Sequence, residues 1–164
     1  MQTYGSKKSL STFIKSAMVA GVGSSILIPS EVMSAPQGGV ISQGNGSISV
    51  DNKTTTVQQT SSSMVVDWQS FNVAADELVK FDQPSAKAAA LNRIHDQNPS
   101  QILGRVDAQG QVYLINPNGI VFGEHSTINI GSLVATTKYL SDTDFMDGNI
   151  VLQQSEGEGS IVNR

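Results

Sequence analysis

Apolar and polar residues alternate in short runs along most of the chain, between positions 40 and 152. Alternation with a period of two places successive side chains on opposite faces of a β-strand. Gly, Asn, Asp, Pro or Ser residues separate the runs, as turn residues separate strands. The pattern predicts strands at Val40–Ser42, Ser47–Val50, Thr54–Gln58, Met64–Trp68, Phe71–Val73, Glu77–Phe81, Gly104–Val106, Val112–Ile115, Ile120–Phe122, Thr127–Ile130, Leu133–Thr136 and Asn149–Leu152.

The phase of this alternation shifts at two places, which indicates how the strands are arranged. The apolar positions of Phe71–Val73 are one step out of phase with those of Met64–Trp68. Leu133–Thr136 follows Thr127–Ile130 with the same slip. A flat strand keeps its phase, whereas a chain that turns a corner with its apolar side inward does not. The shifts favour the stacked coils of a parallel β-helix, although no fixed-period repeat is visible and a β-sandwich or meander remains an alternative.

Two further segments complete the predicted organisation. Ala86–Leu91 has helix propensity but is too short to form a stable helix alone, so we predict a strand or loop there. Residues 157–164 are typical of a turn that leads into another strand, and no capping signal follows. A β-helix that stopped there would leave apolar coil surface and strand edges bare. We therefore expect the domain at residues 36–164 to continue into a longer β-helix beyond the given chain.

The clearest single motif is a strand, a tight turn and a second strand at Gly110–Gly123. Pro117 presets φ for the second position of a turn, and Asn118 and Gly119 tolerate positive φ. We predict a structural turn in which Asn116 bonds its own backbone and Gly119 adopts left-handed dihedral angles. Direct contact between these residues and a partner protein is the alternative.

The first 35 residues have the layout of a secretory signal peptide. Three lysines precede a 13-residue stretch of apolar or small residues at positions 16–28, and Pro29 ends it. A membrane-spanning helix needs about 20 apolar residues, so this stretch is short for an anchor. We predict cleavage near positions 34–35. A buried N-terminal helix and a membrane anchor are the alternatives.

Composition supports an all-β chain and limits its partners. Aromatic residues make up 5% and charged residues 15% of the chain, and 15 residues are Gly, which is a poor composition for a helical bundle. The formal net charge is −4 and no basic stripe exists, which argues against a nucleic-acid partner. The chain has no cysteine, which excludes disulfide bonds, thiolate catalysis and cysteine-ligated metals.

Residues that could carry catalysis or bind a metal are few. His95 and His125 are the only histidines, and they lack metal-ligand spacing. Asp142, Asp144 and Asp147 lack the Gly and Glu of a calcium-binding loop, so we interpret them as part of a solvated acidic loop. We therefore expect no catalytic, cofactor-binding or metal-binding residue and no enzyme. The alternative is a β-helical polysaccharide-cleaving enzyme, but such enzymes need clustered carboxylates and here the acidic residues are scattered.

Three ordered blocks resemble conserved stretches of one protein family. Asp67–Val73 resembles its Trp-x-x-Phe-Asn patch, Leu91–Ile94 followed by Asn98–Gly104 resembles its second block, and Gly110–Gly123 resembles its Asn-Pro-Asn-Gly block. The family is the exoproteins of two-partner secretion, the filamentous haemagglutinin-like adhesins. Their shared N-terminal secretion domain is also called the haemagglutination activity domain. The resemblance covers residues 36–140, and the conjunction of three ordered blocks is specific.

This resemblance implies a fold, a route and a partner. The implied fold is a right-handed parallel β-helix with an N-terminal cap and strands outside the helix. The implied route begins at the Sec translocon, crosses the periplasm and ends in secretion from, or at the cell surface of, a Gram-negative bacterium. The implied partner is an outer-membrane β-barrel transporter that recognises the domain through periplasmic POTRA domains. The exported part then folds outside the cell, with the domain as a template for further coils.

The resemblance also implies a role for the whole protein and for individual residues. The downstream part of an adhesin or haemagglutinin would bind a host-cell or surface glycan receptor, but haemolysins and contact-dependent toxins share the same start. Among the motif residues we expect Trp68 and Phe71 to be core. Asn92 and Arg93 form either an internal brace or a recognition point. The positions implied for transporter recognition are Trp68, Phe71, Asn72, Asn92, Arg93, Ile94, Asn98, Pro99, Gly104, Asn116, Pro117, Asn118, Gly119 and Gly123.

Overall fold

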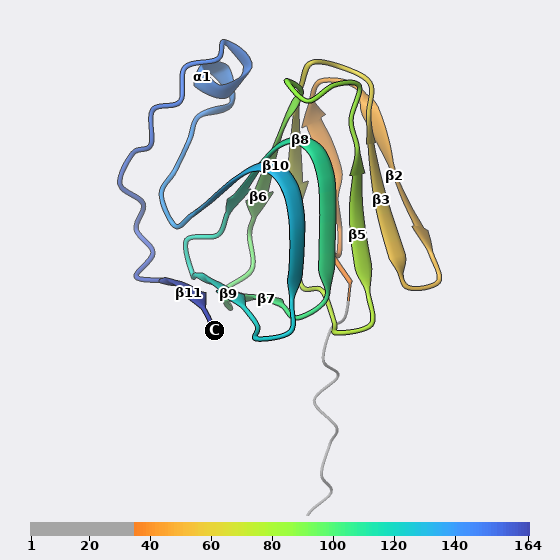
Figure 1. Cartoon of the computed structure of the whole chain (residues 1–164). Coiled ribbons are helices and arrows are strands. Elements are labelled where there is room, and N and C mark those ends of the chain that lie inside the picture. The colour runs from red at the N-terminus through yellow and green to blue at the C-terminus, as the bar shows by residue number, and fades with distance from the viewer. Residues whose placement is uncertain (1–34) are drawn as a thin grey trace, which may run out of the picture. The chain divides into compact units, whose positions relative to one another are not determined.

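Strands are the main elements of residues 35–164, the part of the chain that the computed structural model describes (Figure 1). The predicted signal peptide lies outside the described residues, apart from its last residue. No helix in the described part is long and apolar enough to cross a membrane. The elements of this part are β1 (Val40–Gln43), β2 (Gly46–Asp51), β3 (Thr54–Gln59), β4 (Ser63–Trp68), β5 (Leu78–Asp82), β6 (Ala89–Ile94), β7 (Ser100–Ile102), β8 (Arg105–Ile115), β9 (Ile120–Phe122), β10 (Thr127–Thr136), α1 (Asp142–Met146) and β11 (Ile161–Asn163).

Most of these strands stack in parallel as a right-handed parallel β-helix of about 3 turns, which confirms the predicted fold class. The first face of each coil contains β3, β5 and the first halves of β8 and β10. The second face contains β4, β6 and the second halves of β8 and β10. The third face contains β7, β9 and β11. Figure 1 shows β3, β5, β8 and β10 side by side on the first face.

The coils differ in length, which explains why the sequence has no fixed repeat. On the first face Thr54 pairs with Leu78, Leu78 pairs with Arg105, and Arg105 pairs with Thr127. The number of residues between paired positions is largest from Leu78 to Arg105 and smallest from Arg105 to Thr127. The register of β10 shifts where the chain passes from the first face to the second. This shift confirms the corner that the change of phase indicates.

Two antiparallel strands, β1 and β2, cap the N-terminal end of the β-helix. β1 pairs with β4 and β2 pairs with β3, so each cap strand occupies an edge of the first coil. Ile41 and Ile48 of the cap pack against the interior. The predicted cap and the strands outside the helix are therefore present, and they close two edges that would otherwise be open to pairing.

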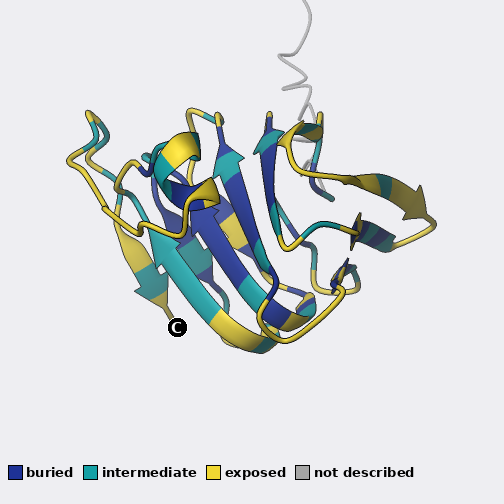
Figure 2. Ribbon diagram, turned by 90° about the horizontal axis from the view of Figure 1, so that it is seen from above, coloured by how far each residue is buried: buried dark blue, intermediate teal, exposed yellow. Residues whose placement is uncertain are grey.

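Apolar side chains fill the interior of the β-helix and alternate with outward-facing polar side chains along the strands. Figure 2 shows buried positions concentrated on the central strands, whereas the connections and some outer strands are exposed. Burial of this apolar surface is the main stabilising contribution to the coils. The interior residues with no exposed surface are Val57, Met64, Val66, Phe71, Val73, Val79, Ala90, Ile102, Val106, Val112 and Ile120.

A second apolar cluster lies on the outer side of the second face. Residues 137–160, here called the excursion, leave the β-helix after β10 and return to it in β11. Leu140 and Phe145 of the excursion are buried against Val65, Leu91 and Tyr113. The rings of Phe145 and Tyr113 meet edge to face, with 5.4 Å between their centroids. Because the excursion crosses strands of successive coils, it ties those coils together.

The structure contradicts two local predictions and confirms a third. Asn149–Leu152 is exposed and irregular rather than a strand, because it lies in the excursion away from the parallel sheets. The predicted acidic loop contains α1, whose start is capped by Ser141 through a hydrogen bond accepted from the amide of Asp144. Ala86–Leu91 is a loop that leads into the start of β6, as predicted, because pairing with β4 and β8 overrides its helix propensity.

Candidate functional site

Most of the residues that carry the family resemblance converge on one corner of the β-helix, where the second face turns into the third. β4, β6 and β8 enter this corner stacked on one another, and β7 and β9 leave it. Gly104 and Gly123 lie at the next corner, between the third and first faces. The residues at the first corner or next to it, here called the motif corner, are Trp68, Phe71, Asn72, Asn92, Arg93, Ile94, Asn98, Pro99, Asn116, Pro117, Asn118 and Gly119.

A buried pair of polar side chains braces the coils from inside. The indole Nε1 of Trp68 donates a hydrogen bond to Oδ1 of Asn92 at 3.0 Å. The amide nitrogen Nδ2 of Asn92 donates to the carbonyl oxygens of Tyr113 at 3.3 Å and Ala90 at 3.4 Å. Asn92 has no exposed surface, so each of these bonds satisfies a group that water cannot reach. Of the two roles left open for Asn92, its contacts are those of an internal brace that links three successive coils.

The aromatic pair of the first block fills the same corner from within. Trp68 is 1% exposed and Phe71 has no exposed surface, and their rings meet edge to face with 5.4 Å between centroids. This confirms the prediction that both are core. Gly39 of the preceding cap lies so close that a Cβ there would be 2.4 Å from the Trp68 ring. The chain that leads into the cap therefore packs directly on Trp68.

The Asn116–Gly119 segment forms the predicted structural turn. Oδ1 of Asn116 accepts a hydrogen bond from the amide of Asn118 at 2.9 Å, and the carbonyl of Asn116 accepts one from the amide of Gly119 at 3.0 Å. Gly119 has a φ of 110°, in the region that glycine adopts without a steric penalty. The turn brings the chain from β8 into β9.

The same asparagines also bind the coil below the turn. Nδ2 of Asn116 donates to the carbonyl oxygen of Asn98 at 3.1 Å and to Oγ of Ser100 at 3.0 Å. Nδ2 of Asn118 donates to the carbonyl oxygen of Asp96 at 2.8 Å. Asn116 has no exposed surface. These bonds fix the spacing between two successive corners, which is the structural reason for amide side chains at both positions.

The returning end of the excursion covers the turn from the other side. The amide of Gly159 donates to the carbonyl oxygen of Pro117 at 3.1 Å, and the amide of Ile120 donates to the carbonyl oxygen of Ser160 at 3.0 Å. A Cβ at Gly157 would be 2.2 Å from the Pro117 carbonyl oxygen, and one at Gly159 would meet the backbone of the turn equally closely. The contact between the excursion and the turn was not predicted from the sequence. The Gly-x-Gly at residues 157–159 could have indicated it, because glycines allow two backbones to approach closely.

Arg93 holds the excursion from outside, on the opposite side of β6 from Asn92. Its Nη2 donates to the carbonyl oxygen of Leu140 at 2.9 Å and to Oδ1 of Asp142 at 2.5 Å. Its guanidinium carbon lies 5.5 Å from the centre of the Tyr139 ring, within cation–π range. The Arg93 side chain is only 14% exposed. We call this set of contacts the Arg93 clamp.

Asp67 extends the Arg93 clamp to the first coil. Its Oδ1 lies 3.4 Å from Nη1 of Arg93 and 2.9 Å from Nε2 of His95. Burial raises the pKa of the Asp67 carboxyl. Hydrogen bonds from His95 and Ser42 and the charge of Arg93 together lower the pKa by more than burial raises it, so the pKa lies below its ordinary value. The ionised carboxylate therefore belongs to the native clamp.

The remaining motif residues divide into packed and exposed positions. Oδ1 of Asn72 accepts a hydrogen bond from the amide of Gln101 at 2.8 Å and so aligns the third faces of two coils. A Cβ at Gly104 would be 2.0 Å from the carbonyl oxygen of Ala74, so only glycine fits there. Asn98 and Pro99 are exposed. Ile94 is buried in the interior, and a Cβ at Gly123 would be 2.8 Å from Leu103.

A second buried polar brace was not predicted from the sequence. Nε2 of Gln83 donates to Oε1 of Gln59 at 3.1 Å, and Oε1 of Gln83 accepts from the amide of Gly110 at 2.9 Å. Both glutamines are 3% exposed. They lie at the corner between the first and second faces, in successive coils. Gln59 and Gln83 are separated along the chain by the same number of residues as Thr54 and Leu78 in the first coil. The later coils differ in length, so this spacing does not recur as a repeat in the sequence.

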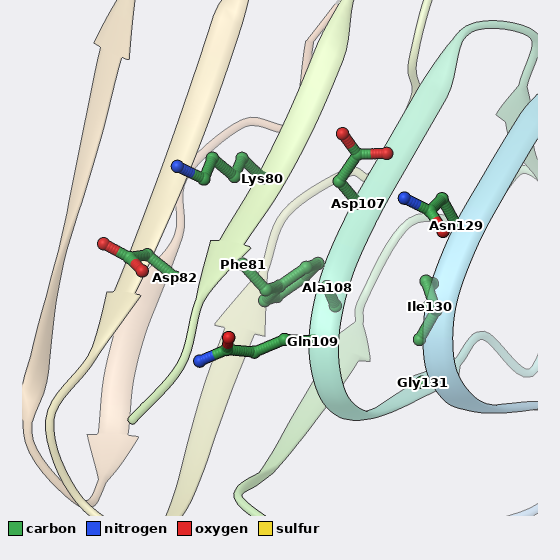
Figure 3. Close-up of a pocket in the computed structure, with 9 residues that line it drawn as sticks. All are labelled: Lys80, Phe81, Asp82, Asp107, Ala108, Gln109, Asn129, Ile130 and Gly131. Carbon is green, nitrogen blue, oxygen red and sulfur yellow. The ribbon is translucent and has the colours of Figure 1, made fainter. Parts of the chain in front are cut away.

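The outer side of the first face carries a polar groove of about 510 Å³ (Figure 3). Lys80, Asp107 and Asn129 lie in one row across β5, β8 and β10, at paired positions of neighbouring strands. Asp107 already pairs with Arg105, whose Nε is 2.7 Å from Oδ1 of the carboxylate. No histidine lines the groove, and no group of His, Asp or Glu in residues 35–164 could hold a metal ion. His125 lies in an exposed loop elsewhere.

Comparisons with known proteins agree on one family. The model of the TPS secretion domain matches residues 30–164. The chain is 39% identical over 105 residues to a heme/hemopexin-binding protein of Haemophilus influenzae strain Rd, and 41% identical over 98 residues to a second Haemophilus influenzae protein of that name. The crystal structure of the HMW1 secretion domain from Haemophilus influenzae has a TM-score of 0.74 and 31% sequence identity, over 79% of this chain and 35% of that one.

The matches cover unequal shares of the proteins compared. They span 64% and 58% of this chain but only 12% and 11% of the two heme/hemopexin-binding proteins. The similarity is thus to a small part of those relatives.

Proposed function

The chain belongs to the family of TPS secretion domains, and from that premise we propose that residues 36–164 direct the export of a longer protein. Such a domain implies a cognate outer-membrane transporter. In this proposal residues 1–35 direct the chain through the Sec translocon and are then removed. A β-barrel transporter binds the domain in the periplasm through its POTRA domains. The protein is then secreted from, or displayed on, a Gram-negative cell.

The observation that carries this proposal is the difference between the two ends of the β-helix. β1 and β2 close the N-terminal end, whereas the outer edges of β10 and β11 have no partner strand among the described residues. Ile128 and Leu133 face inward from β10 but are only partly buried, and Ile161 of β11 is 41% exposed. An end of this kind can accept a further coil by parallel pairing. The domain would therefore act as a template on which exported chain folds in one direction.

The motif corner supports export in two ways under this proposal. Its buried members, such as Asn92 and Asn116, maintain the fold that the transporter recognises. Asn98 and Pro99 are exposed at the same corner and are the members that a transporter can contact without unfolding the domain. Recognition would then depend on the buried asparagines indirectly.

For the exported protein as a whole we propose a binding role at the cell surface, as in an adhesin or haemagglutinin of the filamentous haemagglutinin type. Two relatives that share this domain carry the name heme/hemopexin-binding protein, which supports an exported binding protein rather than an enzyme. The receptor, for example a host-cell or surface glycan, would contact the downstream part. A haemolysin or a contact-dependent toxin is the alternative cargo, and a distinct C-terminal domain in the downstream sequence would favour the toxin.

Deletion of residues 36–140 from the full-length protein tests the export role. The signal peptide stays in place, the cognate transporter is co-expressed, and extracellular and periplasmic protein are measured separately. We expect the deleted protein to remain periplasmic, while a deletion of similar length farther downstream is exported. Export that is unaffected by loss of residues 36–140 would overturn the proposal.

Charged substitutions at the C-terminal end of the β-helix, where β10 and β11 have no partner strand among the described residues, test the template role separately. In the variant Ile130→Lys with Leu133→Lys, charge on the inward side of the last coil would hinder stacking of the next coil. We expect the protein to be exported but its downstream part to be degraded by added protease. Full protease resistance downstream would contradict the template role and leave the export role intact.

A further inference from the structure

The excursion presents an exposed apolar surface that the fold does not use. Residues 146–154 are nine consecutive exposed positions. They include Ile150, Val151 and Leu152, which are 44%, 53% and 36% exposed. Nearby Tyr139 is 43% exposed. A contiguous apolar patch of this kind on a secreted domain marks an interaction site more often than a random surface.

One antiparallel bridge joins two segments of the excursion, here called the ribbon, and leaves one backbone edge free. Tyr139 and Gln153 are joined by two antiparallel hydrogen bonds, at 2.9 and 2.8 Å between the amide of one and the carbonyl oxygen of the other. The alternate amides, those of Leu152 and Gln154, have no partner among the described residues. A single bridge of this kind is marginal alone and gains stability when a further strand pairs with it. Residues 152–154 are here called the free edge.

Contacts before and after residues 146–154 attach the ribbon to the β-helix. Leu140 has no exposed surface and Phe145 is 2% exposed. The Arg93 clamp binds the chain between them, and Oγ of Ser155 donates to the carbonyl oxygen of Thr137 at 2.5 Å on the other side of the ribbon. The docking of a strand here therefore costs little ordering entropy on the receiving side.

Charge indicates which partner fits the free edge. The excursion contains five acidic residues and one lysine, a net charge of −4. A second copy of the domain would bring the same charge and be repelled, whereas a basic partner would be attracted. The next coil of the same chain is also unsuited, because it would stack on β10 and β11 rather than on the outer side of the second face.

We propose that the free edge at residues 152–154 is a docking site for a β-strand flanked by basic residues in the periplasmic part of the cognate transporter. The partner strand completes the ribbon through backbone hydrogen bonds, and its apolar side chains cover Ile150 and Leu152. The acidic residues around the ribbon attract the basic flanks and speed the encounter. This inference rests on the proposed export function and assigns it a surface outside the motif corner.

Site-specific crosslinking tests the contact directly. A photo-crosslinking residue replaces Leu152 in the full-length protein, and the same residue replaces Val50 of the cap, which is 60% exposed, as the control. We expect an adduct with the transporter from position 152 and none from position 50. An adduct between two copies of the exported protein, equal adducts from both positions, or no transporter adduct from position 152 would overturn the proposal.

Paired substitutions test whether the contact matters for export. We expect Ile150→Ser with Leu152→Ser to reduce the rate of export about tenfold, whereas the control Val40→Ser with Val50→Ser changes it less than twofold. Resistance of each domain to protease confirms that it is folded. Normal export of the first variant would overturn the proposed docking site. It would not overturn the export role, which is contradicted only if export is normal after deletion of residues 36–140.

A charge reversal separates the electrostatic part of the proposal. Asp147→Lys with Glu156→Lys changes the charge of the excursion, and Asp51→Lys with Glu124→Lys makes the same change at exposed sites elsewhere. We expect the first variant to reduce crosslinking from position 152 at least fivefold and the second to leave it within twofold. Equal loss in both variants would show an effect of net charge alone and would contradict a specific acidic site.

Discussion

Asn92 and Arg93 are neighbours in the sequence, but they act on opposite sides of β6. Asn92 faces the interior, where it joins Trp68 to the coil beyond. Arg93 faces outward, where it holds the excursion through Leu140 and Asp142. The inner contacts link successive coils, and the outer contacts link an added segment to those coils. Two adjacent motif residues thus stabilise different parts of the domain, and substitutions should separate their effects.

The largest loss is expected from Asn92→Ala. It leaves the indole N–H of Trp68 buried without a partner, removes one hydrogen bond to the carbonyl oxygen of Tyr113 and opens a small cavity. The free energy of unfolding should fall by about 3 kcal/mol. Urea unfolding followed by fluorescence of Trp68, the single tryptophan, measures it. A loss below about 0.5 kcal/mol, the low end for a single hydrogen bond, would mean that the inner brace contributes little to the coils.

Asn116→Ala should have an intermediate effect, because Asn116 joins a turn to the corner below it. It removes the hydrogen bonds to Asn98 and Ser100 and the one accepted from the amide of Asn118. We expect the free energy of unfolding to fall by about 2 kcal/mol. Asn129→Ala on the exposed first face is the matched control, with an expected change within about 0.5 kcal/mol. Equal effects in the two variants would argue against a special role of the motif corner.

Arg93→Ala should cost less and act locally. We expect about 1 kcal/mol, because the clamp is partly exposed and the apolar contacts of Leu140 and Phe145 remain. Hydrogen exchange at the amides of Phe145 and Gln153 should become faster, while that of the β6 amides should not change. Faster exchange throughout β6 would show that Arg93 and Asn92 support the same unit, which would remove the distinction between them.

The smallest effect concerns pH and Asp67. The pKa of Asp67 is lower in the folded protein than its ordinary value of 3.8. The ionised carboxylate therefore stabilises the folded state, and this contribution is fully present at pH values above 3.8. This contribution is lost as the pH falls through the folded pKa. The variant Asp67→Asn should lose less stability than the wild-type protein between pH 5 and the acid limit, as measured by urea midpoints at each pH. Identical pH profiles would show that Asp67 does not contribute to the clamp.

Much of the interior could be predicted from the sequence, since alternation and its phase shifts are local signals, whereas the choice of a parallel β-helix over a sandwich or meander rests on the family resemblance. Trp68 and Phe71 are predictable as core, and Asn116–Gly119 as a turn, because the residue types limit what those positions can do. The route of the excursion could not be predicted. Arg93 reaches Asp142 across 49 positions, and nothing in the pattern near either residue indicates that contact.

The strand predicted at Asn149–Leu152 illustrates the same limit. Its apolar run resembles those of the coils, but the preceding chain leaves the β-helix at position 137, so no parallel neighbour is available. The side chains are exposed instead of buried. Local pattern gives the propensity of a segment, whereas its pairing depends on where the preceding chain has placed it.

The central claim is that the buried motif residues support export by maintaining the fold, and the variants Asn118→Ala and Gly119→Val test it most directly. Each is made in the full-length protein, and its export by the cognate transporter is measured beside the urea midpoint of the same protein. We expect export and stability to fall together, with Gly119→Val lower in both, because its added Cβ would be 2.8 Å from the Ser160 carbonyl oxygen at a φ of 110°. Loss of export from a variant with the wild-type midpoint would contradict the claim and show that the transporter reads the turn itself.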